Sequence, residues 1–315
     1  MDADDVAQIA ESLRQALSGR RDDPERILAE FGWNELLADE PAVAVSTTCG
    51  LFGELLAAGS VVDAVMIAAS GIDLPDGTRV VLPVPGRATV PGRRTGPGTV
   101  AVDGTVRPGG VGVLIATLGD ERFEFVVAAT LDHDAGDPLD PTVGWRRTAG
   151  DVVASPVSAS DPELGWARMV AAGRRALAHE LIGVASRMLS MTVEHVTDRH
   201  QFNQPLGSFQ AVKHQLADVH LWQQAAILTA AAAWEDQGAP SAALAKASAV
   251  RFSRTARATC QQLLGGMGFT WEHDFHRYLR RALTLEPLLG NASALHRELG
   301  AALRAGDVDG TLIAL

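Results

Sequence analysis

The second half of the chain constrains the fold most, because it consists of long helical segments joined by short turns. Ser160-Asp161-Pro162-Glu163 places a capping side chain, a proline and an acidic residue where each favours the start of a helix. The helix that follows can run to about Thr197, roughly 55 Å at ~1.5 Å per residue. Further helices are expected at about 208–237, from 240 to near 265, around 275–281 and at 292–305. This pattern predicts an antiparallel four-helix bundle.

The middle of the chain has a different character. Residues 71–110 contain six prolines and nine glycines, too many for a helix. Short β-rich runs occur in this stretch and just beyond it, separated by turn residues: 80–82, 99–102, 113–116 and 123–129. The first 70 residues read as helical, with Val6, Ile9, Leu13 and Leu17 at helical spacing.

The fold class expected is therefore mainly α with an inserted β module. The boundaries are a shortened N-terminal helical part at 1–70, a small antiparallel β module at 71–155 and a C-terminal helical bundle at 156–315.

Composition limits the function classes. The formal net charge of −11 argues against a general nucleic-acid surface, which needs positive potential to neutralise phosphates. Cys49 and Cys260 are too few for a disulfide framework and suggest a reducing compartment. The most apolar stretch, 42–69, is broken by Glu54 and Asp63, so no membrane span is expected. A cytoplasmic location without nucleic-acid or membrane partners is the expectation.

Two motifs in the bundle region carry chemistry. One is Arg-His-Gln-Phe-Asn-Gln-Pro-Leu-Gly-Ser-Phe-Gln at 199–210; the other is Gln-Leu-Leu-Gly-Gly-Met-Gly-Phe at 262–269, followed by Arg-Tyr-Leu-Arg-Arg at 277–281. A glycine pair at a helix end lets backbone N–H groups approach an anion. The arginine guanidinium offers a rigid fork for a pyrophosphate.

Together with the helix–sheet–helix order, these motifs resemble the acyl-CoA dehydrogenase family. In that family the matching positions hold the ADP half of FAD across the dimer interface. The resemblance thus implies FAD shared between subunits, with the cofactor-binding candidates Arg199, Phe202, Gln210, Gln262, Gly265 and Gly266.

The catalytic positions depart from the family pattern. The family base is a glutamate followed by glycine, and here Leu289 precedes Gly290. The alternative glutamate position, on the first bundle helix, matches Gly173. A hydrocarbon or a glycine cannot remove the α-proton of an acyl thioester, so no catalytic residue is assigned. Arg174 matches an arginine often found near that active site and is a substrate-side candidate.

The β module also lacks the family's flavin-covering segments. The stretch 81–87 lies where a Thr-Glu-Pro-x-x-Gly-Ser-Asp segment is usual, and no Trp-Ile-Thr equivalent is present. The sequence therefore keeps the residues that would bind a neighbouring subunit's flavin and lacks the segments that would cover a flavin of its own. This asymmetry matches the short, degenerate subunits of heteromeric bacterial acyl-CoA dehydrogenases, such as those of sterol side-chain degradation.

The resulting interpretation is a subunit of a FAD-dependent dehydrogenase that desaturates an acyl-CoA thioester at its α,β bond. Its partner would be a full-length acyl-CoA dehydrogenase subunit, in a heterotetramer, and the chain would be active only with that partner. The alternatives are a homodimer or larger homo-oligomer with a relocated base (Glu180, Glu194 or Glu286) and a non-enzymatic scaffold. No metal is expected, because His214 and Asp218 lack a third ligand at a known spacing.

Overall fold

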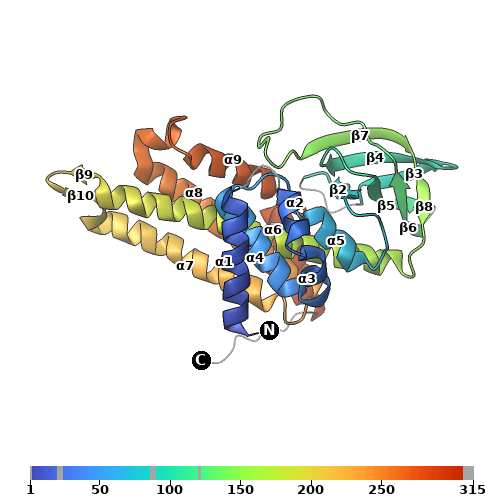
Figure 1. Ribbon diagram of the computed structural model, residues 1–315, viewed down its shortest axis with the longest axis horizontal. Helices are drawn as coiled ribbons and strands as arrows, with labels where there is room; N and C mark the ends of the chain where they lie inside the picture. Colours follow the sequence, from blue (N-terminus) through green and yellow to red (C-terminus); the bar gives the residue numbers. More distant parts are fainter. Residues whose placement is uncertain (1, 20–23, 86–89, 120–121, 308–315) are drawn as a thin grey trace.

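The computed structural model describes residues 2–19, 24–85, 90–119 and 122–307. Helices form both ends of the chain and a small β module lies between them, as Figure 1 shows. This confirms the expected fold class, a mainly α chain with an inserted β module.

The N-terminal part consists of short helices packed along the bundle: α1 (Ala3–Gly19), α2 (Pro24–Glu30), α3 (Trp33–Asp39), α4 (Pro41–Leu55) and α5 (Val62–Ser70). Two glycines explain how closely α4 and the long helix α6 (Pro162–Asp198) cross. A Cβ added at Gly53 would lie 2.1 Å from the Glu180 carbonyl oxygen, and one at Gly183 would lie 2.1 Å from the Gly50 carbonyl oxygen. The two backbones therefore touch at this crossing, and no side chain fits between them.

The β module contains the strands β1 (Arg79–Val80), β2 (Leu82–Pro83), β3 (Gly92–Gly96), β4 (Thr99–Val106), β5 (Val113–Gly119), β6 (Arg122–Ala128), β7 (Arg146–Val153) and β8 (Ser155–Val157). Their hydrogen-bonded order is β2-β4-β3-β5-β6-β8, with β7 beside β4 and β1 beside β5.

The expected small antiparallel module is found with two departures from that pattern, because β1 and β3 each pair with β5 in parallel. β4 runs antiparallel to β3 and then returns the chain to β5, so β3 and β5 point the same way. Residues 86 and 87, part of the stretch where a flavin-covering segment is usual, lie outside the described residues.

The C-terminal bundle consists of α6, α7 (Gln210–Ala232), α8 (Ala239–Leu264) and α9 (Phe275–Leu285), and α10 (Ala292–Ala305) packs on α8. The start of α6 is as expected: the Asp161 carboxylate accepts the Leu164 N–H at 3.0 Å. α7 ends five residues earlier than expected. The Asp236 carboxylate forms a tight turn there, accepting the Gly238 N–H at 2.8 Å.

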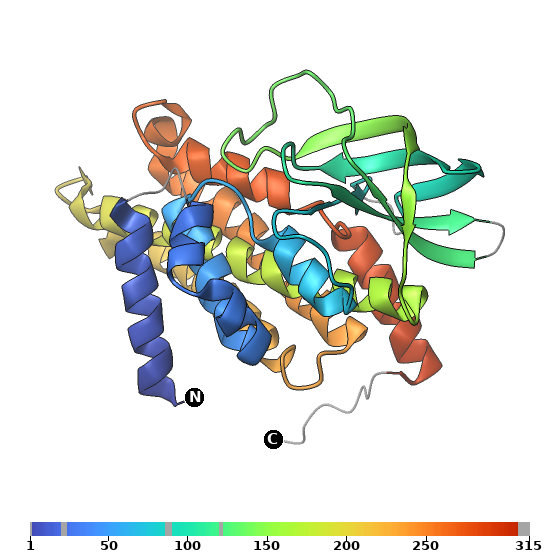
Figure 2. The ribbon, with the colours of Figure 1, turned by 45° about the vertical axis from the view of Figure 1, so that its right-hand side comes forward.

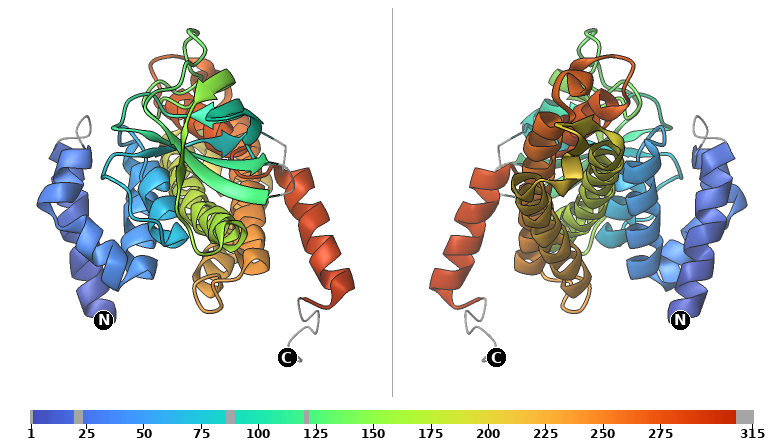
Figure 3. Two further views of the ribbon diagram at one scale, coloured as in Figure 1. Left: turned by 90° about the vertical axis from the view of Figure 1, so that its right-hand side faces the viewer. Right: turned by 90° about the vertical axis from the view of Figure 1, so that its left-hand side faces the viewer.

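Figures 2 and 3 show the β module resting on one end of the bundle, with α1–α3 and α10 on opposite sides of it. One apolar core runs through all three parts, and includes Phe52, Leu114, Phe125, Trp166 and Met169. No helix in the described part of the chain combines the length and apolar character needed to cross a membrane.

A buried arginine ties the β module to the bundle. Arg281 of α9 is fully buried, and its guanidinium donates to Asp140 Oδ2 at 2.5 Å and Glu180 Oε1 at 2.7 Å. It also donates to Thr142 Oγ1 and the Ala57 carbonyl oxygen, both at 2.8 Å. Asp140 and Thr142 lie just before β7, so one side chain joins the β module, α6 and the segment after α4.

Candidate functional site

The first motif forms a hairpin at the end of the bundle farthest from the β module, seen at the left of Figure 1. β9 (His200–Gln201) pairs with β10 (Gln204–Pro205). Phe202 and Asn203, which turn the hairpin, both have positive φ, 53° and 62°. This is the backbone geometry of a two-residue hairpin turn, and it places Phe202 at the tip.

The candidate residues of this motif lie on the surface. Phe202 is 86 % exposed, and its ring meets the Phe209 ring edge-on at 6.3 Å between centroids. Arg199 and Gln210, which flank the hairpin, are exposed as well. The Arg199 side chain forms no ion pair with any other residue in the described ranges, so its charge remains available to an anion.

The second motif ends α8 and continues into a short 3₁₀ segment, η2 (Gly265–Phe269). Gly265 has φ 58° and ψ −136°, a conformation open mainly to glycine. A Cβ added at Gly265 or Gly266 would meet no atom within 4 Å, and Gln262 is exposed. The backbone here is bare of side chains, as close approach of an anionic group requires.

Both motifs lie at the same end of the bundle, which we call the hairpin end. The pKa of His195, on the last turn of α6, is lowered by burial and by the nearby positive charges of His273 and Arg199. His273 follows η2, so the two motifs share one electrostatic environment. The exposed rings of Phe269 and Trp271 also lie in the η2 region. The arginine, the amides and the bare glycines thus fit a nucleotide diphosphate at this surface.

The two positions that the resemblance matches to a catalytic glutamate, Gly173 and Leu289, lie against each other. A Cβ added at Gly173 would lie 2.5 Å from Leu289 Cδ1 and 3.0 Å from Met66 Sδ. Leu289 is 4 % exposed and has φ 53°, in the left-handed region that a leucine rarely adopts. The side chains of Leu289 and Met66 therefore close over Gly173, where an acidic side chain would have to stand.

Buried cations hold the 286–290 segment in this conformation. Arg174 Nε donates to the Leu289 carbonyl oxygen at 3.0 Å, and its two Nη atoms grip the Glu298 carboxylate at 2.6 and 2.8 Å. Lys246 Nζ donates to the carbonyl oxygens of Glu286 at 3.1 Å, Leu288, and Gly290 at 2.7 Å. Burial and the Arg174 charge lower the pKa of Lys246 well below its usual value. All three guanidinium nitrogens of Arg174, the substrate-side candidate, thus already have partners within the chain.

The three glutamates considered as relocated bases are all ion-paired. Glu180 is buried against Arg281, and burial raises its pKa. Glu286 accepts from Arg254 and from Arg257, the latter at 3.0 Å, and Glu194 pairs with Arg187 at 3.2 Å on the surface. In the described ranges no group of three His, Cys, Asp or Glu side chains could hold a metal ion.

Sequence reasoning did not identify Met66 or Lys246 as neighbours of the base position. Met66 lies on α5 and Lys246 on α8, so only the packing brings them to Leu289. The sequence did hold a signal for Lys246. It is one of only two lysines, and its neighbours within 242–250 are mostly alanine, as expected for a buried helix. Nothing in the sequence distinguished Met66 from a core residue.

Known proteins resemble different shares of this chain. Residues 166–303 match the model for the acyl-CoA dehydrogenase C-terminal domain. The acyl-CoA dehydrogenase IpdE2 of Mycobacterium tuberculosis is 42 % identical over 123 residues, which is 39 % of each chain. The match thus spans about two fifths of that relative's length.

Two solved structures extend the likeness over nearly the whole chain. The steroid ACAD Tcur3481-Tcur3483 superposes with a TM-score of 0.80 at 22 % identity, covering 96 % of this chain and 99 % of that one. The ChsE4-ChsE5 complex from Mycobacterium tuberculosis gives 0.76 at 21 % identity, with 96 % and 98 % covered. Residues 166–303 thus match the acyl-CoA dehydrogenase C-terminal domain, and the fold of the two superposed structures is followed from the N-terminal helices to the end of the bundle.

Proposed function

We propose that this chain is a subunit of a FAD-dependent acyl-CoA dehydrogenase that carries no catalytic base of its own. In this proposal its hairpin end clamps the ADP part of a FAD held mainly by a partner subunit. The observation that carries the proposal is the packing of Leu289 and Met66 over Gly173, at the position where the chemistry needs a carboxylate.

The missing base follows from charge and space together. Abstraction of an α-proton needs a group that can accept a proton within hydrogen-bonding reach of the substrate. Leu289 cannot accept one, and a side chain at Gly173 would have to displace the Leu289 and Met66 side chains. Each glutamate offered as a replacement is already ion-paired with an arginine. We therefore propose that α-proton abstraction belongs to the partner subunit.

The clamp role is supported by the groups left free at the hairpin end. A bound FAD would supply the hydride acceptor of the reaction. Arg199 would pair with its pyrophosphate, and the backbone N–H groups around Gly265 and Gly266 would approach the same anion. The exposed Phe202 ring and the amides of Gln210 and Gln262 would contact the rest of the nucleotide.

A partner subunit is supported by an unusually exposed helix. Only Val219, Ala226 and Ala230 are buried among the 23 residues of α7. Leu221, Ile227 and Leu228 of the same helix are 63 %, 41 % and 67 % exposed. Exposed apolar side chains in such number on one helix mark a protein interface. The names Tcur3481-Tcur3483 and ChsE4-ChsE5, each joining two proteins, are consistent with a second acyl-CoA dehydrogenase subunit as occupant.

The test compares the chain alone with the chain co-expressed with a candidate full-length acyl-CoA dehydrogenase. We expect little flavin and no turnover with any acyl-CoA and an artificial electron acceptor for the chain alone. For the complex we expect bound flavin and turnover. Near-stoichiometric flavin with turnover by the single chain would instead support a homo-oligomer with a relocated base. No flavin in any assembly would support a non-enzymatic scaffold.

Arg199→Ala tests the clamp within an active complex. Loss of a charge-assisted hydrogen bond costs roughly 1.5–3 kcal/mol, so flavin affinity should fall by about one to two orders of magnitude. The matched control is Arg168→Ala, an exposed arginine near the opposite end of α6. Gln262→Ala, which removes a neutral contact, should cost less. Flavin release is followed by fluorescence on complexes whose assembly is checked by size-exclusion chromatography. Unchanged affinity in an intact Arg199→Ala complex would remove the clamp role.

A further inference from the structure

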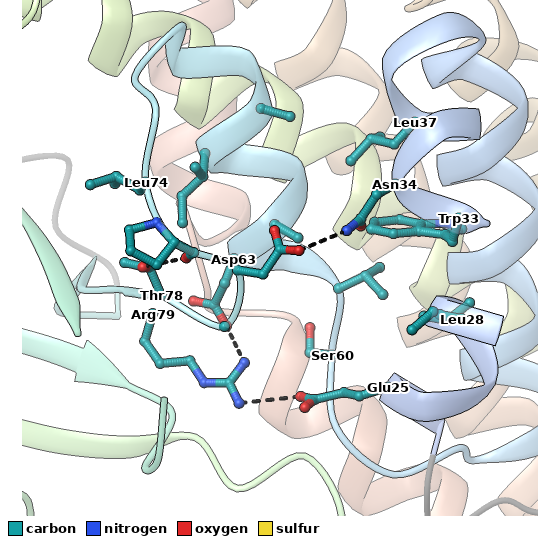
Figure 4. A pocket seen from close by; sticks show the side chains of 18 of the residues that line it. Glu25, Leu28, Trp33, Asn34, Leu37, Ser60, Asp63, Leu74, Thr78 and Arg79 are labelled. Carbon is teal, nitrogen blue, oxygen red and sulfur yellow. Dashed lines mark hydrogen bonds and ion pairs between the residues drawn. The ribbon is translucent and has the colours of Figure 1, made fainter. Parts of the chain in front are cut away.

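A cavity of about 510 Å³ lies between α2, α3, α5 and the segment 74–79, on the N-terminal side of the molecule. Figure 4 shows its lining, with Leu28, Trp33 and Leu37 on one side and Leu74 on the other. The volume is within the range of sites that bind small molecules. Most of the lining side chains are apolar.

This cavity is separate from the catalytic position of the fold. Helix α5 stands between them: Met66 packs on Gly173 of α6. Ala64 and Ala68 line the cavity. Each of these alanines is two positions from Met66 in the sequence, so both lie on the other side of the helix. A molecule in the cavity would therefore not contact Leu289 or Gly173 across α5.

The walls are held in place before any ligand arrives. The Trp33 indole N–H donates to Thr48 Oγ1 at 2.9 Å, which fixes the ring plane. The Asp63 carboxylate accepts the Val80 N–H at 2.9 Å and anchors α5 to β1. At the rim, Asn34 Nδ2 donates to Asp76 Oδ2 at 3.2 Å and joins the two sides, as Figure 4 shows. Such fixed walls reduce the conformational entropy that binding costs.

The charged side chains that line the cavity, Glu25, Asp63, Asp76 and Arg79, disfavour a charged ligand. Each of the four charged side chains that line the cavity already has a partner. Arg79 pairs with Glu25 at 3.2 Å and with Asp63 at 3.8 Å, and Asp76 is held by Asn34. An incoming carboxylate or phosphate would lose hydration and find no unpaired cation, which is costly. Ser60 and Thr78 also line the cavity. Ser60 Oγ accepts the Val62 N–H at 3.2 Å and Thr78 Oγ1 donates to the Pro75 carbonyl oxygen at 2.6 Å, which leaves the Ser60 hydroxyl as a donor and the Thr78 oxygen as an acceptor for a neutral polar group.

We propose that this cavity binds an uncharged, largely apolar small molecule whose single hydrogen-bonding group faces Ser60 and Thr78. The proposal rests on the cavity alone and is independent of the dehydrogenase role, so either can fail without the other.

The test uses Nile red, an uncharged apolar dye, titrated into the full chain and followed by fluorescence. We expect saturable binding that Ala64→Phe weakens by at least about tenfold, because the new ring occupies the cavity. Ala64 is exposed, so the change does not disturb the core. The control is Ala301→Phe, the same change at an exposed alanine of α10 outside the cavity. Ala68→Phe is the second cavity variant, in case the first alters the circular dichroism spectrum.

A competition experiment tests the charge preference. Decanol should displace the dye at concentrations at least about tenfold below those of decanoate, since the two differ mainly in charge. Binding that is unchanged in both folded cavity variants would overturn the proposal. Equal displacement by decanol and decanoate would overturn its claim on uncharged ligands.

Discussion

At the scale of single residues, the contact of Gly173 with Leu289 can be tested through protein stability. Gly173→Ala should destabilise the protein by about 1–3 kcal/mol, because the added methyl overfills the space beside Leu289 Cδ1. Leu289→Ala removes that atom. The double variant should therefore lose less free energy of unfolding than the sum of the two single losses, by at least about 1 kcal/mol. Urea unfolding of the four proteins measures this coupling.

The control for this cycle pairs Gly173→Ala with Leu13→Ala. Leu13 is equally buried but lies on α1. Their effects should add within about 0.5 kcal/mol. Additive behaviour of Gly173 and Leu289 as well would mean that the two positions do not touch in solution.

A second residue-scale prediction concerns pH. The His179 ring accepts the Trp234 indole N–H at 3.1 Å, and burial together with Arg175 lowers its pKa to about 4. The unfolded chain binds this proton near pH 6.5, so stability is full above that pH and falls as the pH decreases toward 4. Between pH 7 and pH 5 the loss should be about 2 kcal/mol.

His179→Gln keeps an acceptor for Trp234 but cannot take up the proton. Its urea-derived stability should therefore change less between pH 7 and pH 5 than that of the parent chain, by about 2 kcal/mol. An identical pH dependence in the two proteins would mean that His179 is not held neutral in the fold.

At this scale the sequence predicted local features better than distant ones. The cap at Asp161 was predictable because its signal lies within four residues. The absence of a carboxylate at Gly173 and Leu289 was readable from the sequence as well. That Leu289, Met66 and Gly173 fill one another's space was not, because they lie on elements far apart in the chain. The nucleotide-contacting roles of Arg199 and Gln262 stay predictions.

At the scale of elements, α7 leaves several large apolar side chains exposed to solvent. Its apolar residues exceed what the chain itself buries, so we expect the surplus face to bury against another subunit. Leu221→Asp with Leu228→Asp should abolish association with the partner subunit and leave the unfolding midpoint nearly unchanged. Leu303→Asp, a similarly exposed leucine on α10, is the matched control. Light scattering after size-exclusion chromatography measures the mass.

Loss of assembly in the Leu303 variant, or its persistence in the α7 double variant, would contradict this assignment. The sequence predicted α7 because helical periodicity is a local property. It did not show the exposed face, which depends on how far α6 and α8 cover the helix. The parallel pairing of β3 with β5 escaped prediction for a similar reason, since strand partners are chosen by the whole sheet.

At the scale of the whole molecule, Arg281 joins the parts. Arg281→Met would leave the Asp140 and Glu180 carboxylates buried without their cation, so we expect a destabilisation of about 3–5 kcal/mol. Amide hydrogen exchange should accelerate most in the segment 140–153, which loses its anchor to the bundle. The control is Arg277→Met, one turn earlier on α9, where an exposed pair with Asp274 should contribute at most about 1 kcal/mol. Equal effects of the two substitutions would refute the anchoring role.

The burial of Lys246 has a practical consequence for mapping any assembly. The chain has two lysines, and Lys246 is fully enclosed by carbonyl oxygens, whereas Lys213 is exposed on the first turn of α7. A bifunctional succinimidyl ester can therefore attach to one side-chain amine of the native protein, beside the hairpin end. Each cross-linked peptide recovered by mass spectrometry through that amine therefore sets an upper limit on the distance between Lys213 and the partner residue it is joined to.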